Sequence, residues 1–265
     1  MVTLLTEDSR SVASKLFAIL NFVSDDPSGG STLSEIAAGT GLPLSTTHRL
    51  VAEWVHWGGL SKSRDGGYAI GARIWEVGMT SPSIQTLRSA AMPFLEDLHN
   101  TTKQHAQLAI LQGEDALYIE KLSSRNSAEL ISRPGIRLPL HATGVGLVLL
   151  AHSGNHFVDS FLRKELPVFT PRTVVDPDEI RQRLEEIRTR GYVRTEEELH
   201  LGVTSVAAPV RDRRGTTVAA MSVVVPLSLE SPTPLETLVQ WGALGTSRVL
   251  GFQRTRDGVD GLDGG

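Results

Sequence analysis

The sequence predicts a two-domain protein: a mainly helical winged helix-turn-helix domain, then an α+β domain built on an antiparallel sheet. Two observations lead to this fold class. Residues 32–60 have the spacing of two helices joined by a tight turn, and a short hairpin pattern follows them. Beyond residue 100, strand and helix patterns are mixed. We expect the first domain at 9–76, a helical linker at 77–100, the second domain at 101–253 and a disordered tail at 254–265.

The composition is that of a folded, non-membrane protein. Of its 265 residues, 40% are hydrophobic and 21% are charged. The chain has no cysteine, which excludes disulfides, thiolate metal sites and cysteine nucleophiles and fits a reducing compartment. No apolar run is long enough to cross a bilayer, and the first residues do not resemble a signal peptide. We therefore expect a cytoplasmic protein with no membrane partner.

The first domain should begin with three helices. Residues 11–23 place apolar side chains on one helical stripe, and a polar loop follows at 25–31. Thr32 and Glu35 then have the spacing of a capping box, which satisfies the free amides at a helix start. Gly41 supplies the backbone freedom that a helix end requires. These signals predict a second helix from about residue 32 to 41.

The third helix has the features of a DNA-recognition helix. Pro43 is acceptable in its first turn, where the missing N–H costs nothing. Short hydrogen-bonding or basic side chains then crowd its beginning, and we expect these residues to bind DNA: Ser45, Thr46, Thr47, His48 and Arg49. Polar side chains at the front of a helix with an apolar stripe behind them suit the major groove. The alternative is a helical hairpin that packs on another surface.

A small hairpin should follow as the wing. Asp65, Gly66 and Gly67 form a turn signal between two short extended pieces. Lys62 and Arg64 lie on this hairpin and could reach phosphate groups or the minor groove. The alternative is an ordinary solvated hairpin.

The charge of the first domain counts against DNA binding. Residues 1–80 carry six basic and eight acidic side chains, a net charge of −2, and the whole chain carries −4. Phosphate neutralisation supplies most non-specific DNA affinity, so a winged helix used for protein contact stays open as an alternative.

The remaining elements are expected as follows. A connecting helix should span 74–80 and, after a break at 81–83, a second should span 84–100 with a kink at Pro93. Strands are expected at 105–111, 116–122, 128–132, 192–195, 203–212 and 216–226. Helices are expected at 144–151, 155–164, 176–191 and 233–250.

Taken in order, these pieces resemble the IclR family of bacterial transcriptional regulators over roughly residues 10–252. The matching segments are SEIAAGTGLPLSTTHRLV, GGYAIG, RLPLHATGVG, RGYVRTEEELHLGVTSVAAPVRD and VAAMSVVVP. The resemblance implies a winged helix-turn-helix, a linker helix and a GAF-like domain that binds a small effector. It also implies a homodimer or a dimer of dimers (a tetramer) that binds a (pseudo)palindromic double-stranded DNA operator as a repressor or activator, without a cofactor.

The effector site is expected at the start of a buried helix. Thr143 can cap this helix, and the free amides that follow suit a carboxylate, while Gly144 and Gly146 let a ligand approach the backbone. The alternative is that both glycines serve close packing of helix on sheet. The resemblance implies these effector-binding residues: Leu130, Leu138, Gly144, Val145, Thr195, Ser205 and Ser222.

Three positions depart from the family pattern. The residue before Ser45 is often lysine and is Leu44 here, which removes a phosphate contact. The residue after Gly146 is commonly lysine and is Leu147 here, and a common pocket cysteine is replaced by Ser205. The last two changes leave the identity of the effector open.

No catalytic or metal site is expected. Glu196, Glu197 and Glu198 stand beside His200, but consecutive carboxylates point in different directions, so we expect a solvated loop there. The sequence has no nucleophile elbow, phosphate-binding loop or dinucleotide fingerprint. An enzyme that turns over a small acid in the second domain is the remaining alternative.

Overall fold

A computed structural model describes residues 11–26, 30–124, 132–229 and 233–253. These residues divide into two compact units, 1–85 and 86–265, and each is described by itself. Among the described residues, no helix combines the length and apolar character that a membrane span needs.

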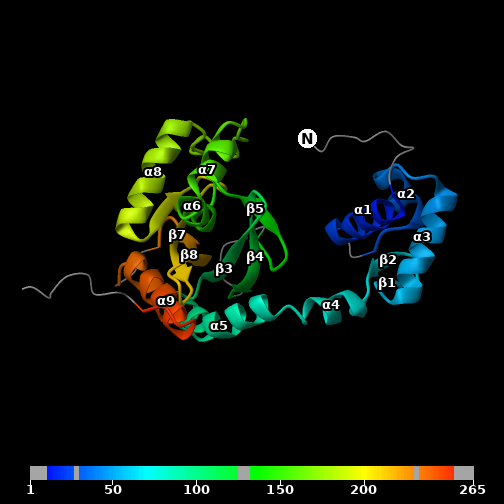
Figure 1. The fold of residues 1–265 in the computed structure, drawn as a ribbon, viewed down its shortest axis with the longest axis horizontal. Helices are drawn as coiled ribbons and strands as arrows, with labels where there is room; N and C mark the ends of the chain where they lie inside the picture. The colour runs from blue at the N-terminus through cyan, green and yellow to red at the C-terminus, as the bar shows by residue number, and fades with distance from the viewer. Residues whose placement is uncertain (1–10, 27–29, 125–131, 230–232, 254–265) are drawn as a thin grey trace, which may run out of the picture. The chain divides into compact units, whose positions relative to one another are not determined.

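The first unit is the expected winged helix-turn-helix (Figure 1). Its elements are α1 (Val12–Asp25), α2 (Leu33–Thr40), α3 (Leu44–Trp57), β1 (Leu60–Lys62), β2 (Tyr68–Ile70) and α4 (Ala72–Gly78). The antiparallel pair β1–β2 forms the wing. Buried side chains of the three helices and the wing make its core, among them Ile19, Ile36, Leu50 and Leu60.

Local capping explains where the helices of this unit begin and end. Thr32 and Glu35 form the predicted capping box at α2, and Gly41 ends that helix at φ 69°. Pro43 is the N-cap of α3 at ψ 140° and is not in the first turn, because its extended conformation is that of a residue just outside the helix. The helix therefore begins at Leu44.

The second unit is built on a six-stranded antiparallel sheet in the order β5-β4-β3-β8-β7-β6. The strands are β3 (His105–Gln112), β4 (Asp115–Leu122), β5 (Arg137–Pro139), β6 (Val193–Glu196), β7 (Val203–Arg211) and β8 (Thr217–Pro226). Its helices are α5 (Pro82–Thr102), α6 (Gly144–Ala151), α7 (Asn155–Leu162), α8 (Pro177–Arg190) and α9 (Leu235–Val249). The predicted α+β class is confirmed. One helix, α5, runs through Pro93.

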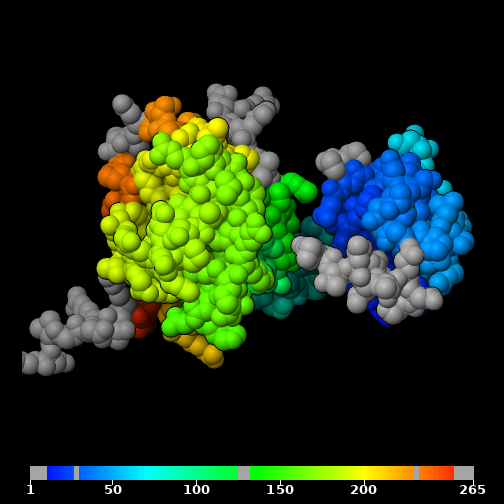
Figure 2. Space-filling view, turned by 90° about the horizontal axis from the view of Figure 1, so that it is seen from above, coloured from blue at the N-terminus to red at the C-terminus, as the bar shows by residue number. Residues whose placement is uncertain are grey.

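Helices cover both faces of the sheet. On one face α6 packs on β7 and β8 and is covered by α8 (Figure 1). On the other face α9 packs on β7 and β8, and its Gly242 lies against Met221 of β8 and Leu98 of α5. Figure 2 shows the α7 and α8 surface in yellow-green, closing one side of this unit. This arrangement buries α6 between the sheet and an outer layer of helices.

The sequence of α6 accounts for its position. All eight of its residues are glycine, alanine, valine or leucine, and all eight are buried, so the helix has no polar face to present to water. Leu147, where the family commonly has lysine, is 0% exposed and is a core residue. The outer helix α8 shows the opposite pattern, with Asp176 as its N-cap and Gly191 at φ 74° as its end, both as predicted.

One predicted strand falls almost wholly on residues that the structure does not describe. The segment 128–132 lies outside the described residues except for Ser132, which belongs to no strand. β4 pairs with β3 on one side and with β5 on the other, and the three residues of β5 are too few to give an alternating pattern in the sequence. The predicted disordered tail, 254–265, also lies outside the described residues.

Candidate functional site

The front of α3 presents three of its predicted DNA-binding side chains to solvent. Ser45, His48 and Arg49 are exposed, and Thr46 is half-buried. Thr47 is 0% exposed, and its hydroxyl donates to the Pro43 carbonyl at 3.1 Å. The structure thus corrects the predicted set, because the Thr47 side chain cannot reach a base.

The burial of Thr47 could have been predicted from the sequence. It precedes Leu50 by three residues and Val51 by four, and both of these are buried. Residues at this spacing share one face of a helix, so Thr47 belongs to the apolar stripe.

The wing presents the two predicted basic side chains. Lys62 and Arg64 are both exposed, and the Lys62 ammonium lies 5.6 Å from the centre of the Tyr68 ring. The turn between β1 and β2, which contains Arg64, is held by the Ser63 hydroxyl, which bonds to the Asp65 carboxylate and to the Gly67 carbonyl. This fixes the tip of the hairpin.

The charges near this surface are not all available to a partner. Among the ion pairs of the described residues, none includes Arg49, Lys62 or Arg64. Arg73, in contrast, pairs with Glu76 at 2.7 Å. Glu35 is occupied by its capping box. The positions of these three basic side chains therefore favour phosphate binding, although the net charge of residues 1–80 is negative.

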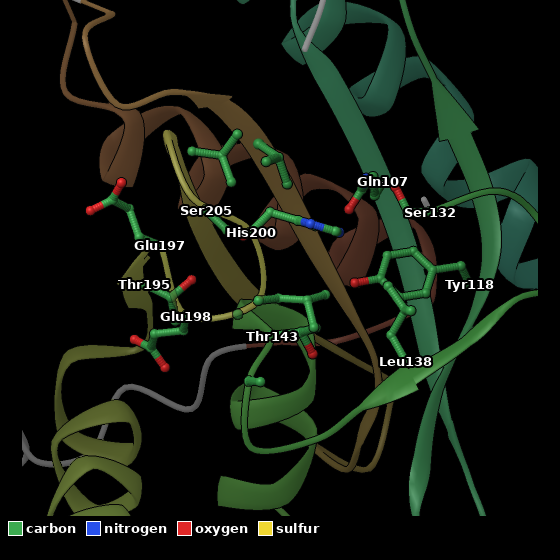
Figure 3. A pocket seen from close by; sticks show the side chains of 15 residues that line it. Gln107, Tyr118, Ser132, Leu138, Thr143, Thr195, Glu197, Glu198, His200 and Ser205 are labelled. Carbon is green, nitrogen blue, oxygen red and sulfur yellow. Dashed lines mark hydrogen bonds between the residues drawn. The ribbon is translucent and has the colours of Figure 1, made fainter. Parts of the chain in front are cut away.

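A cavity with about 450 Å³ of empty space opens in the second unit at the beginning of α6 (Figure 3). Its walls come from β3, β4, β5, β6, β7, β8, the first residues of α6 and the turn after β6. Four predicted effector-binding residues line it: Leu138, Gly144, Thr195 and Ser205. The structure brings these four together from four separate elements.

The strand register explains this convergence. Thr195 pairs with Ser205, and Ser205 pairs with Val224, so these side chains share one face of the sheet. Ser222 lies on the same face, two residues before Val224 on β8, and pairs with Gln107 of β3. The sheet face on which α6 packs therefore carries a band of small and polar side chains.

Two predicted effector residues, Ser222 and Val145, contribute no side chain to the cavity lining. Ser222 is 1% exposed, and its hydroxyl donates to Oε1 of Gln107 at 3.4 Å, behind the cavity wall. The Val145 side chain is buried in the core of the second unit. Leu130 lies outside the described residues.

The start of α6 forms one polar end of the cavity, where Thr143 caps the helix. The Thr143 hydroxyl donates to the Pro139 carbonyl at 2.8 Å and accepts from the Gly146 amide at 3.1 Å. Gly144 and Val145 lie in the first turn of α6, where no helix carbonyl stands four residues earlier to accept from their amides. These two N–H groups can therefore bind a ligand.

Burial raises the pKa of Tyr118 well above its ordinary value, so this phenol, hydrogen-bonded to Thr143, stays protonated.

Most of the other lining residues were not predicted, among them Gln107, Tyr118, Ser132 and His200. A bulge explains Tyr118, because the register shifts between Leu108, which pairs with Glu120, and Ala109, which pairs with Tyr118. The only available signal was a polar Gln107 within an apolar strand pattern. Bulges and loop positions give no such signal.

The predicted solvated loop at the three glutamates is wrong for Glu198. This residue is 7% exposed, and its two carboxylate oxygens accept from Arg183 at 2.7 and 3.0 Å. Glu196 ends β6 and pairs with Arg194 at 2.9 Å. Within the described ranges, no group of histidine, aspartate and glutamate is placed to hold a metal ion.

A winged helix-turn-helix joined to a domain with an open, polar-lined cavity is the architecture of a DNA-binding protein that responds to a small ligand. The family model described as "IclR helix-turn-helix domain" matches residues 12–63, and "Bacterial transcriptional regulator IclR C-terminal" matches residues 80–232. The chain belongs to the IclR family. It is a ligand-responsive transcriptional regulator of that type, and the family is one of regulators, not enzymes.

Similar proteins cover nearly the whole chain. The HTH-type transcriptional regulator XynR of Escherichia coli is 31% identical, over 83% of this chain and 89% of its own length. The HTH-type transcriptional repressor AllR of Klebsiella pneumoniae is 31% identical, over 91% and 90%. The crystal structure of an IclR homolog from Microbacterium hydrocarbonoxydans, complexed with 4-hydroxybenzoate, is 33% identical, covers 91% of this chain and 99% of its own, and superposes with a TM-score of 0.86.

The two glycines of α6 should respond differently to alanine. A Cβ at Gly146 would lie 2.4 Å from the Leu140 carbonyl oxygen, which is backbone and cannot turn away. We expect Gly146→Ala to destabilise the protein by about 1–3 kcal/mol, seen as a lower Tm. Gly144→Ala is the matched control, since its Cβ would meet the Ser205 hydroxyl at 2.8 Å, a side chain that can rotate. Equal Tm values for both variants would contradict the packing role of Gly146.

Proposed function

We propose that this protein binds a (pseudo)palindromic DNA operator as a homodimer or dimer of dimers, and that a small carboxylate effector in the second domain controls this binding. The observation that carries the DNA part is the exposed front of α3, with Ser45, His48 and Arg49 available for base and phosphate contacts. Lys62 and Arg64 on the wing add phosphate contacts. Thr46 contributes at the edge of this surface, and Thr47 supports it from within.

Exposed apolar side chains support a homo-oligomer. In the first unit Val12, Phe17 and Trp75 are 55%, 59% and 67% exposed. Large apolar side chains in such numbers favour burial against another protein surface. A second copy of the chain would supply that surface, and its two-fold symmetry would match a palindromic operator.

The cavity supports a small carboxylate as effector. The helix amides of Gly144 and Val145 and the hydroxyls of Thr195 and Ser205 can donate hydrogen bonds to a carboxylate, and Leu138 supplies an apolar wall. The related structure with bound 4-hydroxybenzoate supports an aromatic acid in particular. The relatives named AllR are repressors, which supports repression as the sign of control.

A direct contact links the cavity wall to helix α5. Arg88 of α5 donates to Oε2 of Glu120 at 2.6 and 3.0 Å, and Glu120 lies on β4 two residues beyond Tyr118. The next residue, Lys121, donates to the Ser132 carbonyl at 2.7 Å. A ligand that moves this wall therefore acts on α5, and it controls DNA binding to the extent that it prefers one arrangement of the chain.

A gel shift tests the DNA part against the alternative of protein contact. The purified protein should retard the DNA upstream of its own gene at low salt and more weakly at high salt, because phosphate contacts release counterions. No shift at low salt would favour a winged helix used for protein contact.

A thermal-shift screen with small carboxylates tests the effector part, since a bound ligand raises the Tm. Turnover of such an acid by the purified protein would instead support an enzyme.

A further inference from the structure

The turn between β6 and β7 places a histidine over the cavity. Figure 3 shows the His200 imidazole pointing across the cavity toward Gln107. Its Nε2 atom is buried and has no hydrogen-bond partner among the described residues. A buried polar atom left unpaired is costly, so its presence in a cavity wall indicates a group that pairs with it when the cavity is filled.

The turn that carries His200 is firmly held. The Thr170 hydroxyl donates to the Glu197 carbonyl at 2.6 Å, and the Thr173 hydroxyl donates to the Glu198 carbonyl at 2.7 Å. The Glu197 carboxylate accepts from the Gly202 amide at 2.8 Å, which closes the turn. With the ion pair from Arg183 to Glu198, these bonds fix the turn, so His200 is positioned before a ligand arrives.

The wall that His200 faces is polar and also fixed. Nε2 of Gln107 donates to the Ser132 hydroxyl at 2.7 Å, and Oε1 of the same amide accepts from Ser222. Since the Ser132 oxygen accepts from Gln107, its own proton is available to the cavity. Ser132 is 6% exposed. Figure 3 shows this wall on the other side of the cavity from Thr143, which caps α6.

We propose that His200 and Ser132 form a second polar subsite that reads a hydroxyl group at the end of the effector opposite its carboxylate. A hydroxyl can donate to or accept from the imidazole Nε2 in either tautomer and accept from Ser132 at the same time. A hydrogen or methyl group at that place would leave the His200 Nε2 atom and the Ser132 hydroxyl proton without a partner. The effector class is thereby narrowed from small carboxylates to hydroxy acids. This inference rests on the proposed carboxylate site.

The test compares ligands that differ only in the hydroxyl. The affinities of 4-hydroxybenzoate and benzoate are measured by calorimetry for the full-length protein, His200→Phe and His200→Gln. We expect the unmodified protein to prefer 4-hydroxybenzoate by about tenfold, the net effect of one or two hydrogen bonds. In His200→Phe, where only Ser132 of the subsite remains, the ratio should fall to about three or less through weaker 4-hydroxybenzoate binding, with benzoate unchanged. His200→Gln, which keeps a hydrogen-bonding group, should restore part of the preference.

Controls separate the two levels of the proposal. His156→Phe makes the same change at an exposed position of α7 and should leave the ratio unchanged. If both acids bind and the ratio is the same in His200→Phe, the hydroxyl subsite is overturned while the carboxylate site stands. If neither acid binds the unmodified protein, the proposed aromatic-acid effector is overturned, and the subsite with it. Ser132→Ala is a second test of the subsite and should lower the preference for 4-hydroxybenzoate over benzoate.

Discussion

Replacing Arg49 with alanine weakens binding to the operator by an expected 1–3 kcal/mol, roughly 5- to 150-fold. Arg49 is exposed at the front of α3 and takes part in none of the ion pairs between described residues, so its guanidinium is available to a guanine edge or a phosphate. Few other positive charges near this helix can compensate, because residues 1–80 carry a net charge of −2. Fluorescence anisotropy with labelled operator DNA measures the change.

A control on the same helix makes this result specific. His56 is exposed in the last turn of α3, away from the polar front, and His56→Ala should leave operator affinity within about twofold. The Tm of both variants should match that of the unmodified protein, since neither side chain is buried. Unchanged operator affinity in Arg49→Ala would contradict the assignment of α3 as the recognition helix.

Ser205→Trp should abolish the response to effector and leave DNA binding intact. Ser205 lies on β7 between Thr195 and Val224, and its hydroxyl is close to Gly144, so an indole at this position fills the cavity. A ligand at 100 times its Kd stabilises the unmodified protein by about 2.7 kcal/mol, and this rise in Tm should disappear in the variant. Operator affinity without effector should stay within about twofold, because the change lies in the second unit.

The matched control is Ser228→Trp, the same change at an exposed residue after β8. It should keep the full effector response. Where the indole lowers the Tm of Ser205→Trp by overpacking, Ser205→Leu fills less space and gives the same test. An effector-induced rise in Tm as large in Ser205→Trp as in the unmodified protein would contradict the assignment of the cavity as the effector site.

Local signals in the sequence predicted the elements that depend on near neighbours. The capping box at Thr32, the N-cap at Asp176 and the glycine end at Gly191 each need only residues within one helical turn. The buried helix α6 followed from its lack of polar residues. The exposure of Arg49 at the front of α3 agrees with the same kind of local argument, and applying helical periodicity to Thr47 would have predicted its burial.

The rest of the site depends on contacts between distant segments. Tyr118 faces the cavity because of a bulge in β4, and His200 because a turn is tied to Thr170 and Thr173, some 30 residues earlier. Neither feature has a periodic pattern to predict it. Glu198 looked like part of a solvated run because its partner Arg183 lies on another element. Leu44 is 54% exposed at the first position of α3, and nothing in the structure explains the absence of a lysine there.

The central claim is that one protein binds DNA and a small acid with affinities that depend on each other. The most direct measurement is the Kd of the effector for the free protein and for the protein saturated with operator DNA. Linkage requires the effector Kd to change on DNA binding by the same factor by which the effector changes operator affinity. We expect this factor to be about 5–150 and equal in both directions. An effector that binds the cavity with the same Kd whether or not operator DNA is bound would contradict the claim.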